Sequence, residues 1–464
     1  MTIRAITVET QIPETTLARR LGPIDAAAIV VSNVIGGGIF FVPIIVAGLV
    51  PSGPGLFAVW LLGGVLAFAG AMAYAELATL RPHAGGEYVY LREAYGPMAA
   101  FLTGWTSFVA GFSGAIAAGA LALAEYLGRF IPAAADRTAL LTLPVPWVDL
   151  VVTRQALVAI AAILALSFVH FHGSGRVVHN LLAGAKVSAL LVFIALGLGW
   201  GHGSWANLAG AHVVPNPGTG WLLALVPVMF TYSGWNAAAY VAEEIRDPSR
   251  NVPLALGLGT IAVVGIYLLL NALYLYAMPI SDLSALTGRL TDLVAEQLFG
   301  FVAGNLLAVF TIVSLAASIS AMVMAGPRVY YAMARDHVFL KSAAQVHPRY
   351  RTPMLAIFAQ AIWSSVLVLS GTLPKLVTYT GFAVVLFSGV AVLSVFVLRR
   401  REPMADRPFK ALGYPYAPGF FVAASAVMVV YELVNNPGPT GAGLLVIAAG
   451  VPVYFWFSRR SDRR

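Results

Sequence analysis

Long apolar segments follow one another along this chain, separated by short polar stretches. Each segment could cross about 30 Å of hydrocarbon as a helix, at about 1.5 Å per residue. The pattern therefore predicts an all-α integral membrane protein with 12 transmembrane helices. The predicted spans are residues 24–49, 54–79, 98–130, 152–171, 178–200, 221–242, 252–278, 299–330, 354–371, 376–398, 417–433 and 442–458.

Two spans are interrupted at their centres, which makes helices 1 and 6 discontinuous. The first interruption lies within Val31–Pro43, where a Ser-Asn pair precedes the glycines 36–38. Each glycine costs about 1 kcal/mol relative to alanine inside a helix. The second lies within residues 230–236, and Gly234 follows Gly37 by 234 − 37 = 197 positions. The interruption thus recurs one half-protein later.

Matched interruptions in two halves of a membrane chain indicate a transporter binding site. Free N–H groups near Gly37 to Ile39 would attract a carboxylate, and carbonyls near Phe230 to Ser233 would attract an ammonium group. For the first segment alone, close helix packing through small residues is an equally good interpretation. Phe230 is also the candidate gate. The candidate substrate-binding residues are Ile35, Gly36, Gly37, Gly38, Ile39, Phe230, Thr231, Ser233, Gly234 and Asn236.

Composition supports the membrane assignment, since 59% of residues are hydrophobic and 10% are charged. Soluble domains are about 25% charged. The net charge of +8 is compatible with a nucleic-acid partner, but 22 of the 28 lysines and arginines fall on one predicted side and five on the other. By the positive-inside rule this asymmetry predicts a multi-pass protein of the cytoplasmic membrane with both termini in the cytoplasm. The chain has no cysteine, so disulfides are excluded.

Lys186 is the one lysine or arginine far from the ends of a predicted span. It lies ten positions beyond Arg176, about 15 Å along a helix, which is too deep for its stem to reach water easily. We expect its side chain to face the bundle interior and to bind backbone carbonyls. Ser318 shares a helix face with Ser314, four positions earlier, and is a candidate partner in coupling.

Two further segments carry charge near the predicted cytoplasmic side. Glu76 lies at the end of the second span, where we expect it to face water, with a buried counter-ion as the alternative. Residues 81–96 form an amphipathic loop that we expect to be a short interfacial helix. No cleavable signal peptide is expected, because the first apolar segment is too long for one.

Several motifs resemble the amino acid–polyamine–organocation superfamily, particularly bacterial relatives of the L-type amino acid transporters. The matching motifs are Gly-Gly-Gly-Ile-Phe at 36–40, Ala-Tyr-Ala-Glu-Leu at 73–77, Gly-Gly-Glu-Tyr-Val-Tyr-Leu-Arg-Glu-Ala-Tyr-Gly at 85–96, Tyr-Ser-Gly-Trp-Asn at 232–236, Glu-Glu-Ile-Arg-Asp-Pro at 243–248, Ala-Arg-Asp-His at 334–337 and His-Pro-Arg-Tyr-Arg-Thr-Pro at 347–353. One departure lies in the glycine run, where many relatives have Gly-Ser-Gly.

The resemblance implies a five-plus-five inverted repeat with substrate between the breaks of helices 1 and 6. The repeats would be residues 24–200 and 221–398, with helices at 417–458 peripheral, residues 1–23 a cytoplasmic arm and 459–464 a cytoplasmic tail. The resemblance also implies that Lys186 occupies the region of the sodium site of sodium-coupled relatives.

The leading hypothesis is sodium-independent transport of neutral L-amino acids by alternating access. The pocket walls predicted from the order of helices offer no countercharge for a charged side chain. These walls are Phe108, Ala237–Ala239, Phe382 and Ser388. The apolar neighbours of Lys186 favour proton-linked uptake, and polar partners would instead keep it charged and suit obligatory exchange. The sequence leaves the oligomeric state open, and we expect no cofactor.

Other classes of function fit the sequence less well. A non-transporting amino acid sensor would need an effector domain, and the tails are short. The chain lacks a Walker A motif for ATP-driven pumping and a His-Glu-x-x-His run for membrane-embedded catalysis. It also lacks the charged rings or repeated filter motif of a channel.

Overall fold

The computed structural model describes residues 17–145, 148–171, 175–211, 220–286, 290–370, 373–435 and 437–461. Within these ranges the chain is mostly helical, and eight helices are long and apolar enough to cross a membrane. Four shorter apolar helices accompany them, at Pro23–Val34, Gly220–Tyr232, Met354–Ser370 and Gly443–Arg459. Each predicted apolar segment is helical over most of its length, apart from the interruptions.

The elements follow the chain in this order. The first half contains α1 Pro23–Val34, η1 Gly38–Phe40, α2 Val42–Leu49, α3 Gly53–Leu80, α4 Glu87–Tyr95, α5 Pro97–Thr106, the π-helical turn η2 Ser107–Gly111, α6 Phe112–Leu127, η3 Pro132–Ala135, β1 Ala139–Val145, β2 Val148–Thr153, α7 Arg154–Phe171, α8 Gly175–Trp200 and η4 Trp205–Ala209. The second half contains α9 Gly220–Tyr232, α10 Ala237–Tyr240, η5 Ala242–Glu244, α11 Pro248–Ala277, α12 Ile280–Ala285, α13 Leu290–Phe299, α14 Phe301–Arg335, η6 Lys341–Ala344, α15 Met354–Ser370, α16 Leu373–Arg401, α17 Tyr416–Asn435 and α18 Pro437–Ser461.

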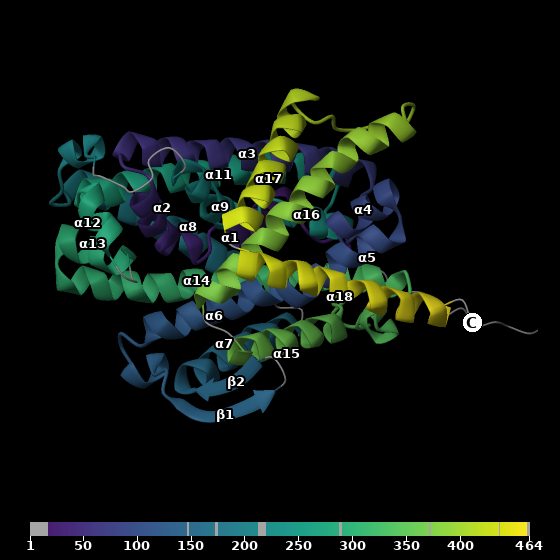
Figure 1. Ribbon diagram of the computed structural model, residues 1–464, viewed down its shortest axis with the longest axis horizontal. Helices are drawn as coiled ribbons and strands as arrows, with labels where there is room; N and C mark the ends of the chain where they lie inside the picture. Colours follow the sequence, from purple (N-terminus) through teal and green to yellow (C-terminus); the bar gives the residue numbers. More distant parts are fainter. Residues whose placement is uncertain are drawn as a thin grey trace, which may run out of the picture.

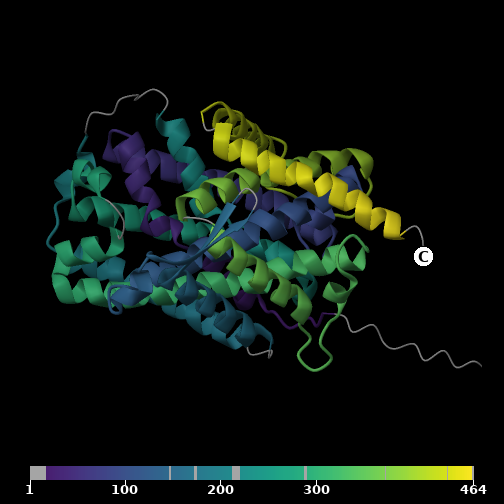
Figure 2. The same cartoon turned by 60° about the horizontal axis from the view of Figure 1, so that its bottom comes forward.

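Most long helices run roughly along the long axis of the molecule (Figure 1). The short helices α12 and α13 lie at one end of the bundle, and α4 lies toward the other. The interrupted helix α1 contacts α8, α11 and α14. The C-terminal α18 lies on the outside in both views and packs on α5 and α16 (Figure 2). The helix that ends just before the glycine motif is therefore surrounded by long helices.

Both predicted helix interruptions are present. α1 ends at Val34, and regular helix resumes only at Val42, with the 3-10 turn η1 between. α9 ends at Tyr232, and α10 begins at Ala237. Gly234, between them, has a φ of +99°, a backbone conformation that favours glycine.

A β-hairpin departs from the all-α prediction. β1 and β2 pair antiparallel, with Leu143 opposite Leu150 and Thr142 opposite Val151. The segment follows the third predicted span and overlaps the first two residues of the fourth. It ends on the β-branched run Val151 to Thr153, which suits strands. Arg154, the first residue of α7, binds Asp136 at 3.1 Å and fixes the base of the hairpin. An apolar-span criterion does not detect so short an element.

α4 is a helix as predicted, but it is not an interfacial surface helix. Six of its nine residues, including Glu87, Tyr88 and Leu91, are buried. The Tyr88 hydroxyl donates a 2.7 Å hydrogen bond to Asp336 at the end of α14, and Arg92 forms an ion pair with the same carboxylate. The amphipathic pattern of the loop therefore reflects contact with other helices of the bundle.

Glu76 is a buried counter-ion, so our expectation that it faces water was wrong. Its side chain is 2% exposed, and Arg399 on α16 binds both carboxylate oxygens, at 2.8 and 2.6 Å. The Ala411 amide donates to it at 2.7 Å, and Arg407 lies 3.4 Å away. These partners are more than 300 positions distant in the chain, so the sequence around Glu76 could not reveal them.

We expect Glu76→Gln to destabilise the protein by about 3 kcal/mol, because removing one partner of a buried ion pair leaves the other uncompensated. The measurement is thermal unfolding of the detergent-purified protein. Glu402→Gln is the matched control: Glu402 pairs with Arg81 at 2.8 Å, but its side chain is 34% exposed. That loss should be about 1 kcal/mol or less. Equal shifts for the two variants would contradict this account.

Candidate functional site

The two helix interruptions meet at the centre of the bundle. A Cβ placed on Gly38 would lie 2.7 Å from Thr231 Oγ1 and 3.1 Å from Thr231 Cα. A Cβ on Gly234 would lie 3.0 Å from the Asn33 carbonyl carbon. Glycine is thus required at both positions so that the two backbones can approach each other. This contact joins segments about 200 residues apart in the chain.

Lys186 holds the end of α1. Its side chain is fully buried, and its Nζ donates to the carbonyls of Ser32 at 3.1 Å and Ile35 at 2.5 Å. The third bond goes to Ser318 Oγ on α14 at 2.7 Å. The ammonium group has three hydrogens, so these bonds use all of its donors. Within the described part of the chain no carboxylate lies within 4.0 Å of Nζ, and the predicted interior carbonyl contacts are confirmed.

Tyr267 on α11 supports both interruptions, and the sequence did not single it out. Its hydroxyl lies 2.7 Å from the Val34 carbonyl and 3.1 Å from the Thr231 carbonyl, and it can donate to either. The side chain is fully buried. A tyrosine in an apolar span is usually a packed aromatic, so only its position between the two breaks reveals this contact.

Unpaired backbone groups remain at the first interruption. Among the backbone hydrogen bonds of the described residues, none uses the N–H of Gly37, Gly38 or Ile39 as donor. At the second interruption the Phe230 carbonyl accepts from Ser233 N at 3.0 Å, whereas no bond is formed to the carbonyls of Tyr232 or Ser233 in the same set. Donors and acceptors are therefore free on facing segments.

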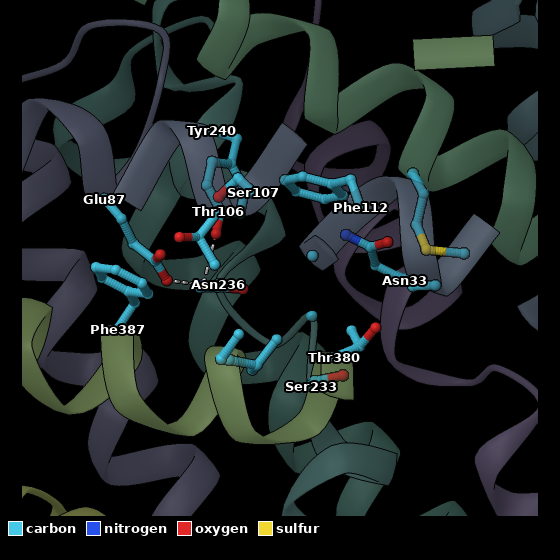
Figure 3. Close-up of a pocket in the computed structure, with 16 residues that line it drawn as sticks. Asn33, Glu87, Thr106, Ser107, Phe112, Ser233, Asn236, Tyr240, Thr380 and Phe387 are labelled. Atoms are coloured by element: carbon cyan, nitrogen blue, oxygen red, sulfur yellow. Dashed lines mark hydrogen bonds between the residues drawn. The ribbon is translucent and has the colours of Figure 1, made fainter. Parts of the chain in front are cut away.

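A two-lobed cavity lies beside these groups. The glycine lobe, of about 70 Å³, is lined by Gly36, Gly37, Gly38, Phe41, Phe230, Thr231, Ser318 and neighbours. The polar lobe, of about 90 Å³, is lined by Glu87, Thr106, Ser107, Phe112, Asn236, Tyr240, Thr380, Phe387 and others (Figure 3). The two lobes share Asn33, Ala115, Ser233 and Met322.

The predicted site residues fall into three groups. Gly36, Gly37, Gly38, Phe230, Thr231, Ser233 and Ser318 line the glycine lobe, and Ser233, Gly234 and Asn236 line the polar lobe. The side chains of Ile35 and Ile39 are fully buried and line neither lobe. Lys186 also lines neither lobe and acts behind the first interruption, through the Ile35 carbonyl and Ser318.

The guessed pocket walls were wrong. Phe108 packs against Tyr330, Phe339 and Trp363, and neither it nor Ala237–Ala239, Phe382 or Ser388 lines a lobe. Phe112 lines the polar lobe instead. The π-helical turn η2 adds a residue to one turn of the helix and so changes which positions face the cavity. The order of helices along the chain does not predict such a turn.

Glu87 is the functional candidate that sequence analysis missed. Its Oε1 accepts from the Tyr74 hydroxyl at 2.5 Å and from Asn236 Nδ2 at 2.9 Å. The side chain is 6% exposed, and burial raises the pKa of its carboxyl above the ordinary value. A glutamate in an apparently interfacial loop gave no sign that it borders a cavity.

Comparison with known proteins finds a family match over almost the whole chain. The family described as "Amino acid permease" matches residues 21–457. The serine/threonine exchanger SteT of Bacillus subtilis (strain 168) is 30% identical over 96% of this chain and 98% of its own length. The human b(0,+)-type amino acid transporter 1 is 30% identical, over 97% and 90%. The mouse Asc-type amino acid transporter 1 is 28% identical, over 95% and 81%.

We expect Gly38→Ala to destabilise the protein by about 1–3 kcal/mol, because the added Cβ overpacks against the Thr231 backbone. Gly37→Ala is the matched control, since its Cβ would meet only Leu315 Cδ2, at an ordinary 3.4 Å, and Phe41. Thermal unfolding of the purified variants measures the difference. If Gly37→Ala were the more damaging change, the close approach of the two interruptions would not be the reason for these glycines.

Proposed function

Because this chain belongs to the amino acid permease family, we propose that it exchanges small neutral L-amino acids by alternating access, without sodium. Its family and relatives are transporters, so it is an amino acid transporter and a multi-pass membrane protein rather than an enzyme. The proposal concerns its substrates, its coupling and its arrangement in the membrane.

The proposed arrangement has 12 membrane crossings in a five-plus-five inverted repeat, residues 24–200 and 221–398. The interruptions one half-protein apart support it, since broken helices in corresponding positions mark such repeats. The charge asymmetry supports termini in the cytoplasm of a cell bounded by a cytoplasmic membrane. Residues 417–458 would then form two peripheral crossings, and the arm and the tail would lie inside.

The substrate's α-carboxylate would bind the free N–H groups of Gly37, Gly38 and Ile39. Its ammonium group would bind the carbonyls of Tyr232 and Ser233 across the glycine lobe. Phe230 lines the same lobe and would close over the bound amino acid. Neither lobe is lined by a lysine or arginine, so an acidic side chain would find no countercharge there, and the small volume of each lobe supports a substrate of modest size.

The hydrogen bonds of Lys186 are the observation that carries the coupling proposal. A fixed ammonium charge beside the first interruption can replace a sodium ion electrostatically. Three bonds to Ser32, Ile35 and Ser318 satisfy all of its donors and favour a permanently charged group. A lysine that keeps its proton cannot move protons through the cycle. The exchanger among the relatives supports the same conclusion.

The test is uptake of labelled serine into proteoliposomes. We expect uptake to require an amino acid inside the vesicle and to be unaffected by imposed sodium or proton gradients. Lys186→Ala should lower exchange at least about tenfold, because it strands buried carbonyls at about 1–3 kcal/mol each. Lys341→Ala, at an exposed position, is the control. Uptake driven by a sodium gradient would contradict the proposal, and so would exchange by the Lys186→Ala variant at the wild-type rate.

The second candidate is proton-coupled uptake, which the apolar burial of Lys186 favoured at the level of sequence. A buried histidine gives it specific support. His179 lies seven positions before Lys186, about two helical turns away on the same face of α8. It is 1% exposed, and neither ring nitrogen has a hydrogen-bond partner in the described part of the chain. Such a ring can pass protons toward the lysine. Proton-driven uptake into vesicles without internal amino acid would identify this mechanism.

A further inference from the structure

The polar lobe lies where the side chain of a bound amino acid would extend. If the carboxylate and ammonium groups occupy the glycine lobe, as proposed above, the shared residues Asn33 and Ser233 form the passage into the polar lobe. The inference below rests on that proposed function. It concerns the part of the substrate that the backbone interruptions do not recognise.

Hydrogen-bond acceptors without partners gather in the polar lobe. Both hydrogen bonds that Glu87 accepts at ordinary distance go to Oε1, and none goes to Oε2 among the described residues, although the Tyr240 and Thr103 hydroxyls also lie close to this carboxylate. Asn236 uses its amide hydrogens on Glu87 and on the Tyr240 hydroxyl, at 2.9 and 3.0 Å, so its Oδ1 remains an acceptor. Figure 3 shows Glu87 and Asn236 joined on one side of the lobe, with Asn33 and Phe112 on the other.

Hydroxyl groups surround these acceptors. Thr106 Oγ1 is buried and has no hydrogen-bond partner in the described residues, and Ser107 lines the same lobe. Buried polar atoms are normally paired, so an unpaired set that borders a cavity indicates a ligand that completes the bonds. The missing group is a donor small enough for this lobe.

We propose that Glu87 determines side-chain specificity by accepting a hydrogen bond from the hydroxyl group of the substrate. The favoured substrates are therefore hydroxyl-bearing amino acids, serine and threonine, over alanine and valine. Oε2 is the acceptor, and Asn236 Oδ1 and Thr106 lie on the same lobe to complete the bonds.

A hydroxyl fits these residues better than a cationic side chain. Among the residues that line the lobe, Glu87 is the only one with a carboxylate. Oε1 already accepts two hydrogen bonds, so one oxygen is left for a ligand rather than the bidentate surface that a guanidinium group prefers. The volume of about 90 Å³ suits a hydroxymethyl or hydroxyethyl group better than a long cationic chain.

The magnitude follows from the cost of leaving the acceptors unpaired. An apolar pocket distinguishes isosteres poorly, whereas a site that hydrogen-bonds a hydroxyl can reject the analogue without it by up to about 10⁴-fold. Threonine and valine differ by one such replacement and have nearly equal volume. With one principal acceptor, we expect threonine to compete at least about tenfold better than valine.

The experiment measures inhibition of serine counterflow in proteoliposomes by threonine, valine, alanine and lysine. In Glu87→Gln, the remaining oxygen stays committed to Tyr74 and Asn236, so the threonine-to-valine preference should fall several-fold. In Glu87→Met, the ratio of inhibition by threonine to inhibition by valine should approach one. The control is Glu93→Gln on the same helix, where the side chain is 31% exposed and the preference should not change.

The ratio separates recognition from a structural role, because a change in folding or turnover alters both inhibitors equally. A wild-type protein indifferent between threonine and valine, or Glu87 variants that keep the preference, would overturn this inference alone. Stronger inhibition by lysine than by threonine would overturn it in favour of a cationic substrate. Failure of every amino acid to support counterflow would instead refute the proposed exchange, and this inference with it.

Discussion

The lipid interior of a membrane offers no water to a backbone group that leaves a helix, so each freed group needs a partner from the protein or a place on the wall of a cavity. This constraint governs the centre of the molecule. Two side chains satisfy the carbonyls at the end of α1. Lys186 donates to the carbonyls of Ser32 and Ile35, and Tyr267 donates to the carbonyl of Val34. The unpaired N–H groups at the following glycines are then available to a ligand. Without these side-chain donors, an irregular backbone at this depth would be too costly to maintain.

The same contacts link substrate binding to helix packing. Ser318 on α14 accepts from Lys186 and donates to the Ile35 carbonyl at 2.7 Å, and it also lines the glycine lobe. Tyr267 connects the end of α1 to the carbonyl of Thr231. Movement of either interrupted helix would therefore disturb groups at the wall of the cavity. Alternating access in this protein would require these bonds to break or to move together with the helices.

The sequence predicted what depends on local pattern. Hydropathy located the apolar spans, and the depth of Lys186 indicated its carbonyl partners. The glycine run at 36–38 and the polar segment around Gly234 located the two interruptions. It failed where the partners are distant in the chain, as for Glu76 with Arg399 and for Tyr267 between the breaks. It also failed where local geometry changes the register, as at the π-helical turn, and so gave the wrong pocket walls. Glu87 was missed because its loop resembled a surface helix.

The central claim is that an amino acid binds between the two interruptions. The chain has no cysteine, so Ser233→Cys introduces a single thiol on the wall shared by the two lobes. The measurement is its rate of modification by a small thiol reagent in proteoliposomes, with and without serine. We predict that serine protects this thiol and that glutamate does not, whereas a thiol at the exposed position Ser204 is unaffected. Modification of Ser233→Cys at the same rate with saturating serine would contradict the account.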